Sequence, residues 1–416
     1  MQQVGERKPS SGCGRLAAVL VFAVRQPPYP PTHGAAIRAH RLLTGLAQAF
    51  PVTMVTYEHE PSAEGQPSLA EIRRNLPGIE IVTVPGLGSE KRRAQAFSIL
   101  SSRSWQWGRY ARLEYGQALE QTVDALQAPI VHFDDLGVVH FARNTRSFNV
   151  FAPHNVEHRI IREAAQAAPG LRRAFATVEW HKVEREELRA WRGVPLCLAV
   201  SPVDAGAMHA GGAQRVELCP NGADPVTHLP LPSRNEDAPL RLLFVGTASY
   251  QPYERGLAWF VSEVLPSLQS VVPVEFDVVG APPLRPSSAP GVIYHGTVAD
   301  LREWYERAHA VVVPVFEGSG TRLKVLEAMA YGRPVVSTRL GAEGLPVRAG
   351  DHYIESERSA DFVQALTGIA ASCVGQDPRL FHMIEQAREA ITPLLWPNIV
   401  ANLVTLYREE IDRHRG

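Results

Sequence analysis

The sequence predicts an α/β protein built from two Rossmann-like domains, and three observations support this fold class. The chain has 416 residues, which is enough for two ordinary α/β domains. Short apolar runs alternate with longer amphipathic segments in both halves, as they do in parallel α/β sheets. Residues 225–238, rich in Pro, Ser and acidic side chains, separate the two halves as an interdomain linker would.

In the first half, apolar runs without polar alternation indicate strands that are covered on both faces. Residues 1–14 are expected to form a disordered leader, and residues 15–225 the first domain. The apolar run 16–24 is too short to span a membrane, and it leads into a loop and helix, not a cleavage site. The predicted strands are 15–24, 52–57, 79–84, 130–133, 148–152 and 196–200, and the predicted helical segments are 35–49, 93–126 and 164–191.

The same alternation restarts after the linker and predicts a second domain over residues 239–395. Its predicted strands are 240–246, 275–280, 292–294, 310–315 and 335–338, and its predicted helices are 256–269, 299–307, 322–331, 359–372 and 377–392. Residues 396–414 have the pattern of a last amphipathic helix.

Residues 311–345, VVVPVFEGSGTRLKVLEAMAYGRPVVSTRLGAEGL, carry the strongest signal for a binding site. A buried strand leads into the turn 317–321, where two glycines let the backbone turn tightly and approach a ligand. Ser319 or Thr321 could cap the helix that follows. The first turn of a helix has unpaired N–H groups and partial positive charge, so a phosphate fits there. We therefore interpret this segment as the phosphate-binding part of a nucleotide site.

Two charged residues interrupt the otherwise apolar helix 322–331. Lys324 and Glu327 are three residues apart and share a helix face with Gly320. Buried helices rarely carry charges that have no partner. Two interpretations stay open: the two side chains pair with each other, or Lys324 binds a diphosphate while Glu327 binds ribose hydroxyls.

Composition excludes several function classes. The net charge of −1 gives no bulk attraction to nucleic acid or to an anionic bilayer. The four cysteines are scattered without a C-x-x-C pair, which indicates neither a zinc site nor a disulfide framework and fits a reducing cytosol. The chain has no G-x-x-x-x-G-K-[ST] loop, so ATP hydrolysis is not indicated. No Asp-x-Asp motif lies in a loop of the second domain, and we predict that no metal is required.

Two such domains place a cleft between them, and ligands of open α/β sheets bind beyond the carboxyl ends of the strands. Sites are therefore expected after Val24, Ala152, Gly246 and Val315. His154 lies just after Ala152, the last residue of the predicted strand 148–152. It either faces the cleft or caps the next helix.

The loop after the first strand contributes a second group of candidates. Gly34 would allow an acceptor or a donor phosphate to come close, or it is a plain turn glycine. His33 and Arg38 lie near it in the sequence and could meet an acceptor.

At this point the sequence resembles a known family, the GT-B glycosyltransferases of group 1, family GT4. The resemblance rests on PYPPTHGAAIRAHRLL at 28–43, PHNVEHR at 153–159, CPNGAD at 219–224, LLFVGTASYQPYERGLAWF at 242–260 and EGSGTRLKVLEAMAYGRPVVST at 317–338. It implies the GT-B fold, in which two Rossmann-like domains face each other across a cleft. The first domain would bind an acceptor, the second a nucleotide-sugar donor, and residues 396–416 would return to the first domain.

The spacing of two glutamates departs from the commoner pattern of this family, which has seven residues between them. Here nine residues separate Glu317 from Glu327, and Ser319 stands eight before Glu327. The turn thus resembles the G-x-G-T-[RK]-x-K variant of bacterial polysaccharide and exosortase-associated sugar transferases. Glu327 keeps the ribose role that the family implies, whereas Glu317 loses its sugar contact. Arg255 is the nearest candidate for the basic residue that often follows the first strand of the donor domain.

The resemblance implies a retaining, metal-independent glycosyltransferase of the hexosyltransferase type. It would move a sugar from a UDP- or GDP-linked donor to a glycan, a lipid-linked acceptor or another hydroxyl, without a further cofactor. His154 and Lys324 would be catalytic, and Arg322 would bind the donor or face solvent. The implied donor-binding residues are Gly246, Thr247, Gly318, Ser319, Gly320, Thr321, Arg322, Lys324 and Glu327.

Two alternatives remain beside this function: an enzyme like the nucleotide-sugar 2-epimerases, and a non-catalytic GT-B partner in a polysaccharide assembly complex. The expected location is the cytoplasm, at the inner face of the membrane if the acceptor is lipid-linked. The basic run 91–93, with Trp105 and Trp107 beyond it, is either a peripheral membrane contact or an ordinary solvated helix face.

Overall fold

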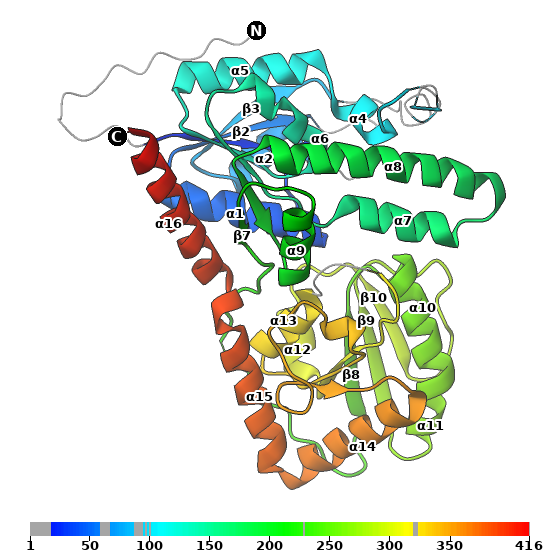
Figure 1. Cartoon of the computed structure of the whole chain (residues 1–416). Coiled ribbons are helices and arrows are strands. Elements are labelled where there is room, and N and C mark those ends of the chain that lie inside the picture. The colour runs from blue at the N-terminus through cyan, green and yellow to red at the C-terminus, as the bar shows by residue number, and fades with distance from the viewer. Residues whose placement is uncertain are drawn as a thin grey trace.

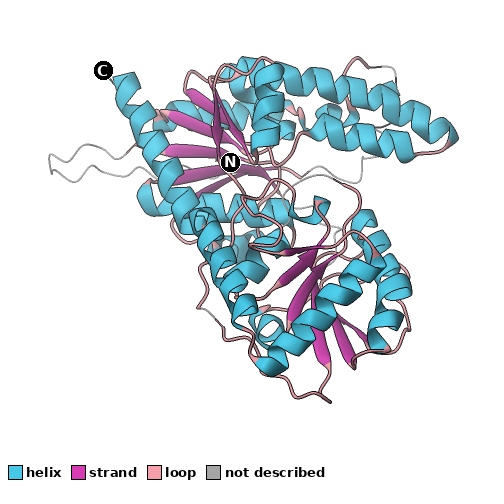
Figure 2. Cartoon of the chain, turned by 60° about the horizontal axis from the view of Figure 1, so that its bottom comes forward, coloured by secondary structure: helices cyan, strands magenta, loops and turns pink. Residues whose placement is uncertain are grey.

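The protein has two α/β lobes, each built on a parallel sheet with helices on its faces (Figures 1 and 2). The computed structural model describes residues 18–58, 67–86, 95, 98–99, 101–227, 229–318 and 323–415. The predicted leader 1–14, the basic run 91–93 and the turn residues 319–322 lie outside the described residues. The predicted α/β class is confirmed.

The first sheet has seven parallel strands in the order β3-β2-β1-β4-β5-β6-β7. Alternate residues of a strand point to opposite faces, so Leu20 and Phe22 belong to one buried cluster and Val21 and Ala23 to another. The strands are β1 Leu20–Ala23, β2 Val52–Tyr57, β3 Ile79–Val84, β4 Ile130–Phe133, β5 Phe148–Phe151, β6 Leu196–Ala199 and β7 Val216–Leu218.

The helices of this lobe are α1 Gly34–Ala49, α2 Leu69–Asn75, α4 Trp105–Tyr110, α5 Leu113–Leu126, α6 Leu136–Val139, the 3₁₀ turn η1 His140–Asn144, α7 Glu157–Ala167, α8 Gly170–Gly193 and α9 Pro202–Ala210.

Two helical segments of this lobe are broken where the sequence predicts continuity. The segment 164–191 divides into α7 and α8 at Pro169, because proline has no N–H and forces Ala168 into an extended conformation. The segment 93–126 breaks between α4 and α5. There the buried Tyr57 hydroxyl donates to the carbonyl of Tyr110 at 2.6 Å and occupies an acceptor that a continuous helix would need.

The second sheet has six parallel strands in the order β10-β9-β8-β11-β12-β13. They are β8 Leu240–Val245, β9 Val274–Val279, β10 Val292–Gly296, β11 Ala310–Val313, β12 Val335–Ser337 and β13 Ile354–Glu355. The helices are α10 Gln251–Trp259, the π-helical η2 Phe260–Val264, α11 Leu265–Gln269, α12 Arg302–Arg307, α13 Leu323–Ala330, the 3₁₀ turn η3 Leu340–Ala342, α14 Ser359–Gly375, α15 Pro378–Ile391, the 3₁₀ turn η4 Thr392–Leu394 and α16 Trp396–Arg415.

Three details of the lobes differ from the predictions. The strands β7 and β13 were missed, since they have only three and two residues and no continuous apolar run. The helix predicted at 256–269 begins earlier, at Gln251, because Pro252 is tolerated in a first helical turn. The strand predicted at 310–315 ends at Val313.

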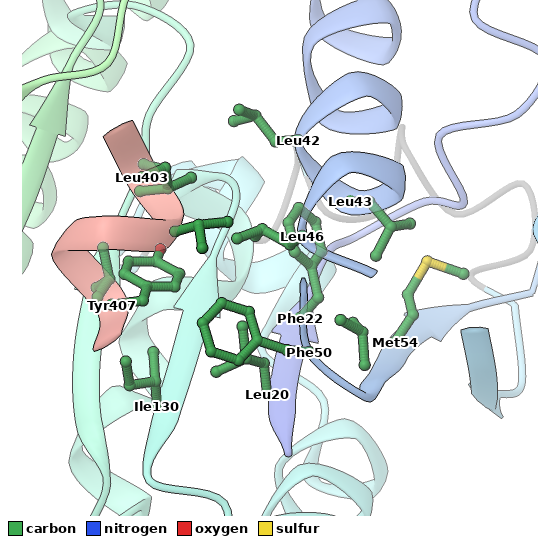
Figure 3. Close-up of a cluster of buried hydrophobic side chains, with 14 of the residues drawn as sticks. Leu20, Phe22, Leu42, Leu43, Leu46, Phe50, Met54, Ile130, Leu403 and Tyr407 are labelled. Atoms are coloured by element: carbon green, nitrogen blue, oxygen red, sulfur yellow. The ribbon is translucent and has the colours of Figure 1, made fainter. Parts of the chain in front are cut away.

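The last helix, α16, begins beside the second lobe and runs along the first (Figure 1). Its residues Leu403 and Tyr407 pack into the same buried cluster as Leu20, Phe22 and Leu46 of β1 and α1 (Figure 3). The core of the first sheet is therefore completed by the end of the chain.

Candidate functional site: the cleft between the two sheets

The carboxyl ends of the two sheets face each other. Gly34, at the start of α1 in the first lobe, lies so close to the second lobe that an added Cβ would be 3.6 Å from Leu323 at the start of α13. Likewise, a Cβ on Gly344, beyond β12, would lie 3.6 Å from Ser201, which follows β6. Loops that follow strands of both sheets thus line one cleft, as expected for open parallel sheets.

His154 is held by a carboxylate from the neighbouring strand. Its Nε2 lies 3.0 Å from Oδ2 of Asp134, which directly follows β4. Asp134 is 1% exposed, and its other oxygen lies 3.8 Å from Nε2 of His132. His132 Nδ1 in turn lies 2.6 Å from the hydroxyl of Tyr407 on α16. Four side chains thus connect the cleft to the last helix.

The ionisation of Asp134 determines which nitrogen of His154 carries a proton. Burial alone would raise the pKa of its carboxyl, but the adjacent His154 and His132 outweigh burial and hold that pKa well below its usual range. An ionised carboxylate only accepts hydrogen bonds, so the His154 Nε2 that contacts it carries a proton. In neutral His154, Nδ1 is then an acceptor. This Nδ1 is buried and has no protein partner among the described residues.

The N-terminal end of α7 fixes the loop that carries His154. The buried Glu187 of α8 accepts hydrogen bonds from the backbone N–H groups of Glu157 and His158, both at 3.0 Å. The same carboxylate lies 2.6 Å from His158 Nδ1. A carboxylate at a helix N-terminus pairs donors that would otherwise be unsatisfied and complements the helix dipole. The helix-capping role considered for His154 therefore belongs to Glu187.

The loop before α1 brings His33 near this group. His33 is the N-cap of α1, and its Nδ1 accepts from the N–H of Ala36 at 3.4 Å. Burial lowers the pKa of His33, and electrostatic interactions with His154 and Arg25 lower it further. Gly34, His33 and His154 are thus together on the first-lobe side of the cleft.

Arg38 lies elsewhere than the sequence analysis expected. It is 1% exposed, and its guanidinium donates to the carbonyl of Pro220 at 2.9 Å and to the side-chain oxygen of Asn221 at 3.2 Å. Arg38 therefore ties α1 to the CPNGAD segment inside the protein. The proposed contact with an acceptor is corrected, because an acceptor in the cleft does not reach a guanidinium at this depth.

In the second lobe, Lys324 comes from α13 and lies beneath the loop that follows β8. Its side chain is 5% exposed, and its Nζ sits 3.7 Å from the ring centre of Phe244 and 3.5 Å from that of Tyr253. A Cβ on Gly246 would lie 2.8 Å from this Nζ. Gly246, the small residue after β8, thus leaves space for the ammonium group of Lys324. Thr247 is the next residue of the same loop.

Glu327 lies one helical turn beyond Lys324 and contacts an aromatic pair. The hydroxyl of Tyr305 donates to its Oε2 at 3.2 Å, and Tyr305 stacks on Tyr331 with ring centres 4.4 Å apart. Burial raises the pKa of Glu327, and the Tyr305 hydrogen bond partly offsets that rise. Asp224 of the CPNGAD segment is near enough to raise it further. Lys324 and Glu327 therefore each have contacts besides the mutual pairing considered above.

The Gly-rich turn is described as far as Gly318. This residue has φ of +92°, a conformation that favours glycine, and it packs against Tyr250 and Pro252 at the start of α10. Ser319, Gly320, Thr321 and Arg322 lie outside the described residues, so their predicted contacts with a donor stay predictions.

Glu317 forms an ion pair at the surface. Both of its carboxylate oxygens accept from Arg255 of α10, at 3.0 and 2.8 Å. The two residues, with Trp259, Phe316 and others, line a cavity of about 300 Å³ beside the turn. Arg255 thus holds Glu317 on the outer side of the turn.

Sequence reasoning missed Asp134, Tyr305 and the ion pair between Arg41 and Asp224. An acid directly after a buried strand, as Asp134 is, would have been a usable signal. Across the part of the chain that the structure describes, no group of three His, Cys, Asp or Glu residues could hold a metal ion.

Comparison with known proteins bears on this arrangement. Residues 239–372 match the family described as glycosyl transferases group 1. A D-inositol 3-phosphate glycosyltransferase of Rhodococcus erythropolis is 28% identical over 179 residues, which are 42% of this chain and 35% of that protein. The match therefore spans about a third of the curated relative.

Solved structures agree over nearly the whole chain. The sucrose-phosphate synthase of Thermosynechococcus elongatus superposes with a TM-score of 0.67 at 17% identity, over 94% of this chain and 98% of that one. The Anabaena protein HepE in complex with UDP-glucose superposes with a TM-score of 0.63 at 12% identity, over 94% and 100%. The chain has the two-lobed GT-B fold, and its residues 239–372 match the group 1 glycosyltransferases.

In this GT-B protein, the group 1 domain comprises most of the second lobe and contains Gly246, Gly318, Lys324 and Glu327. The groups that face them, His33, Gly34 and His154, come from the first lobe.

Proposed function

We propose that the protein transfers a glycosyl group from a nucleotide-diphosphate sugar to a hydroxyl acceptor, with retention and without a metal. One observation supports the proposal: α13, which carries Lys324 and Glu327, begins at Leu323, and Leu323 lies within contact distance of Gly34 at the start of α1 in the first lobe. A donor placed between the two lobes would have its diphosphate at Lys324 and its sugar toward His154.

Lys324 suits the role of stabilising the leaving diphosphate. As the bond from the anomeric carbon to oxygen breaks, negative charge grows on the diphosphate and must be neutralised. Lys324 is buried against Phe244 and Tyr253, so it acts where water screens charges weakly. The N–H groups at the start of α13 add partial positive charge on the same side.

His154 suits a role in orienting the transferred sugar. Its Nε2–H is committed to Asp134, so the unpartnered Nδ1 accepts a hydrogen bond from a sugar hydroxyl. Glu327 suits the ribose, because a carboxylate accepts hydrogen bonds from two neighbouring hydroxyl groups. The buried Tyr305 donates to the same carboxylate, and its raised pKa keeps that hydroxyl protonated.

Retention is proposed to follow from a front-face transfer. The acceptor oxygen would form its bond on the face from which the diphosphate departs, and a departing phosphate oxygen would take the acceptor proton. No covalent carboxylate nucleophile is assigned in this scheme. The anomeric configuration of the product, measured by NMR, tests this step, and an inverted product would contradict it.

The donor is proposed to be UDP-linked, since HepE binds UDP and UDP-glucose in a fold of the same kind. A calorimetric screen with UDP, GDP and their sugars tests the proposal directly. A donor that binds and is turned over with a hydroxyl acceptor supports it. Epimerised sugar formed without any acceptor would indicate the epimerase alternative, and binding without turnover over a broad acceptor panel would indicate the non-catalytic alternative.

The acceptor, the branch and the location are proposed more broadly. A glycan or lipid-linked hydroxyl acceptor, the polysaccharide or exosortase-associated branch, and a cytoplasmic site at the inner face of the membrane follow from the sequence resemblance. No helix in the described part of the chain has the length and apolar character needed to cross a membrane. Product formation on lipid-linked and on free saccharides would separate the two acceptor classes.

A further inference from the structure

A second cavity lies within the first lobe, and its lining residues come from α4, from the segment of α6 and η1, and from the C-terminal half of α8. It encloses about 490 Å³, a size typical of small-molecule sites. None of the cleft residues described above lines it. It is therefore a separate site.

Buried hydrogen bonds hold one wall of this cavity in place. The N–H and the hydroxyl of Ser104 both bind the carboxylate of Glu186 on α8, at 2.9 and 2.5 Å. The N–H of Trp105 binds Glu179 of the same helix at 2.8 Å, and Lys182 pairs with Glu179 at 2.9 Å. Both carboxylate oxygens of Glu186 therefore accept a hydrogen bond from Ser104.

The cavity gathers positive charge. Arg103, Arg143 and Arg189 line it, and each comes from a different element or loop. In the described part of the chain none of the three forms an ion pair, and Glu186 is the single acid in the lining. The whole chain has a net charge of −1, so three arginines around one cavity do not reflect a generally basic surface.

Two ring side chains of the lining have unsatisfied nitrogens. His140 stacks on Trp107 with ring centres 4.3 Å apart, and the Arg103 guanidinium lies 4.4 Å from the Trp107 ring. Within the described residues, neither Trp107 Nε1 nor His140 Nε2 has a hydrogen-bond partner, although both atoms are buried. Burial lowers the pKa of His140 to about 3, so the ring is neutral near pH 7. A ligand with several acceptor oxygens would match this lining.

We propose that this cavity binds the phosphoryl group of a phosphorylated ligand. A guanidinium group can donate two parallel hydrogen bonds to two oxygens of a phosphate. Three guanidinium groups and one carboxylate line this cavity, so the lining carries an excess of positive charge. The cavity is larger than one phosphate group and leaves room for the organic part of a phosphate ester. The ligand is either a soluble phosphate ester or the phosphate headgroup of a lipid.

The test measures binding directly, so it does not depend on glycosyl transfer. Inorganic phosphate is titrated calorimetrically into the wild type and into the double variant Arg143→Ala, Arg189→Ala. We expect the double variant to bind phosphate about tenfold or more weakly, since it loses charge-assisted hydrogen bonds. The matched control is Arg172→Ala, Arg173→Ala, which removes two exposed arginines of the same helix α8 and should leave the affinity unchanged.

Three further results decide the outcome. Equal phosphate affinity of the cavity variant and the control would overturn the proposal. A phosphate signal abolished by Lys324→Ala would place the binding in the cleft and would overturn it as well. Co-sedimentation with phosphatidylcholine vesicles containing phosphatidic acid identifies the source: loss of vesicle binding in the cavity variant, but not in the control, indicates a lipid phosphate, whereas an effect on free phosphate alone indicates a soluble ester.

Discussion

Asp134 illustrates how a single buried carboxylate determines the chemistry of residues around it. It contacts His154, which follows the neighbouring strand β5, on one side and His132 of its own strand β4 on the other. His132 has its pKa lowered by burial and is neutral, so its Nδ1 accepts from the Tyr407 hydroxyl. The ionised Asp134 thus fixes the protonated nitrogen of His154 through a hydrogen bond, whereas its 3.8 Å contact with His132 is electrostatic only.

The first prediction concerns this carboxylate. Its folded-state pKa is depressed, so its contribution to stability is present above the unfolded value of about 3.9 and is lost as the pH falls below it. Asp134→Asn should lower the free energy of unfolding by about 3 kcal/mol at pH 7, because the charge-assisted hydrogen bond between His154 and the buried carboxylate is lost. Denaturant unfolding between pH 7 and pH 3 should show the difference between variant and wild type shrinking below about pH 4.

A matched control is Asp237→Asn, at an exposed acid of the linker. Its unfolding free energy should stay within about 0.5 kcal/mol of the wild type. A difference for Asp134→Asn that is constant over the whole pH range would show that Asp134 is not held ionised by its histidines.

The second prediction separates the two charged residues of α13. Glu327→Ala should weaken nucleotide binding about tenfold, because a carboxylate that accepts from hydroxyl groups is lost. Lys324→Ala should lower kcat about 100-fold with a smaller change in KM, since the charge that it stabilises is greatest in the transition state. Calorimetry and steady-state kinetics measure the two effects. Full activity in both folded variants would refute the site assignment.

At the scale of the elements, glycines decide how closely the segments around the cleft approach. Gly256 in α10 lies against the chain that leaves β11, and an added Cβ would be 1.8 Å from the carbonyl oxygen of Pro314. Gly280 after β9 is similarly close to the carbonyl of Gly246. The loops that form the second side of the cleft are therefore packed backbone against backbone, which holds the turn at Gly318 in place.

The third prediction tests this packing. Gly256→Ala should destabilise the fold by about 2 kcal/mol or more, because backbone must move to admit the methyl group. Gly368→Ala is the control: this glycine is also helical, in α14, but has open space around it. That change should be neutral or stabilising by up to about 1 kcal/mol. Thermal unfolding of the pair measures both, and similar melting temperatures for the two would contradict the close contact.

At the scale of the whole molecule, the two lobes are joined twice. The chain crosses once through the CPNGAD segment and returns through α16. The two crossings are paired, since Ala223 exchanges backbone hydrogen bonds with Leu394 at 3.1 Å and Trp396 at 2.9 Å. Beyond this point α16 lies against α1, where a Cβ on Gly45 would be 2.5 Å from Val400. Any motion of the lobes must therefore pivot about this paired crossing.

The fourth prediction concerns the contact between α1 and α16. Gly45→Ala should lower the melting temperature, because its methyl group collides with Val400 and separates the helices. The double variant Gly45→Ala, Val400→Ala should recover part of the loss, since the second change removes the colliding methyl groups. Differential scanning calorimetry of the three proteins tests the pairing. A double variant less stable than the sum of the single changes would argue against it.

The sequence alone determined the fold class and the approximate positions of most strands, and it singled out Lys324 and Glu327 as candidate site residues. These depend on local patterns: apolar runs for buried strands, and a glycine turn before a helix with two charges for Lys324 and Glu327. Short-range pattern could also locate His154, because it directly follows a buried strand.

Only the tertiary structure decided which of these residues meet. The pairing of His154 with Asp134 spans 20 residues, and that of His132 with Tyr407 spans 275, so neither leaves a local trace. The burial of Arg38 and the gathering of Arg103, Arg143 and Arg189 around one cavity follow from how helices pack on the sheet. The periodicity of a sequence indicates which face of a helix is apolar. It does not indicate which distant charged group a buried polar atom will contact.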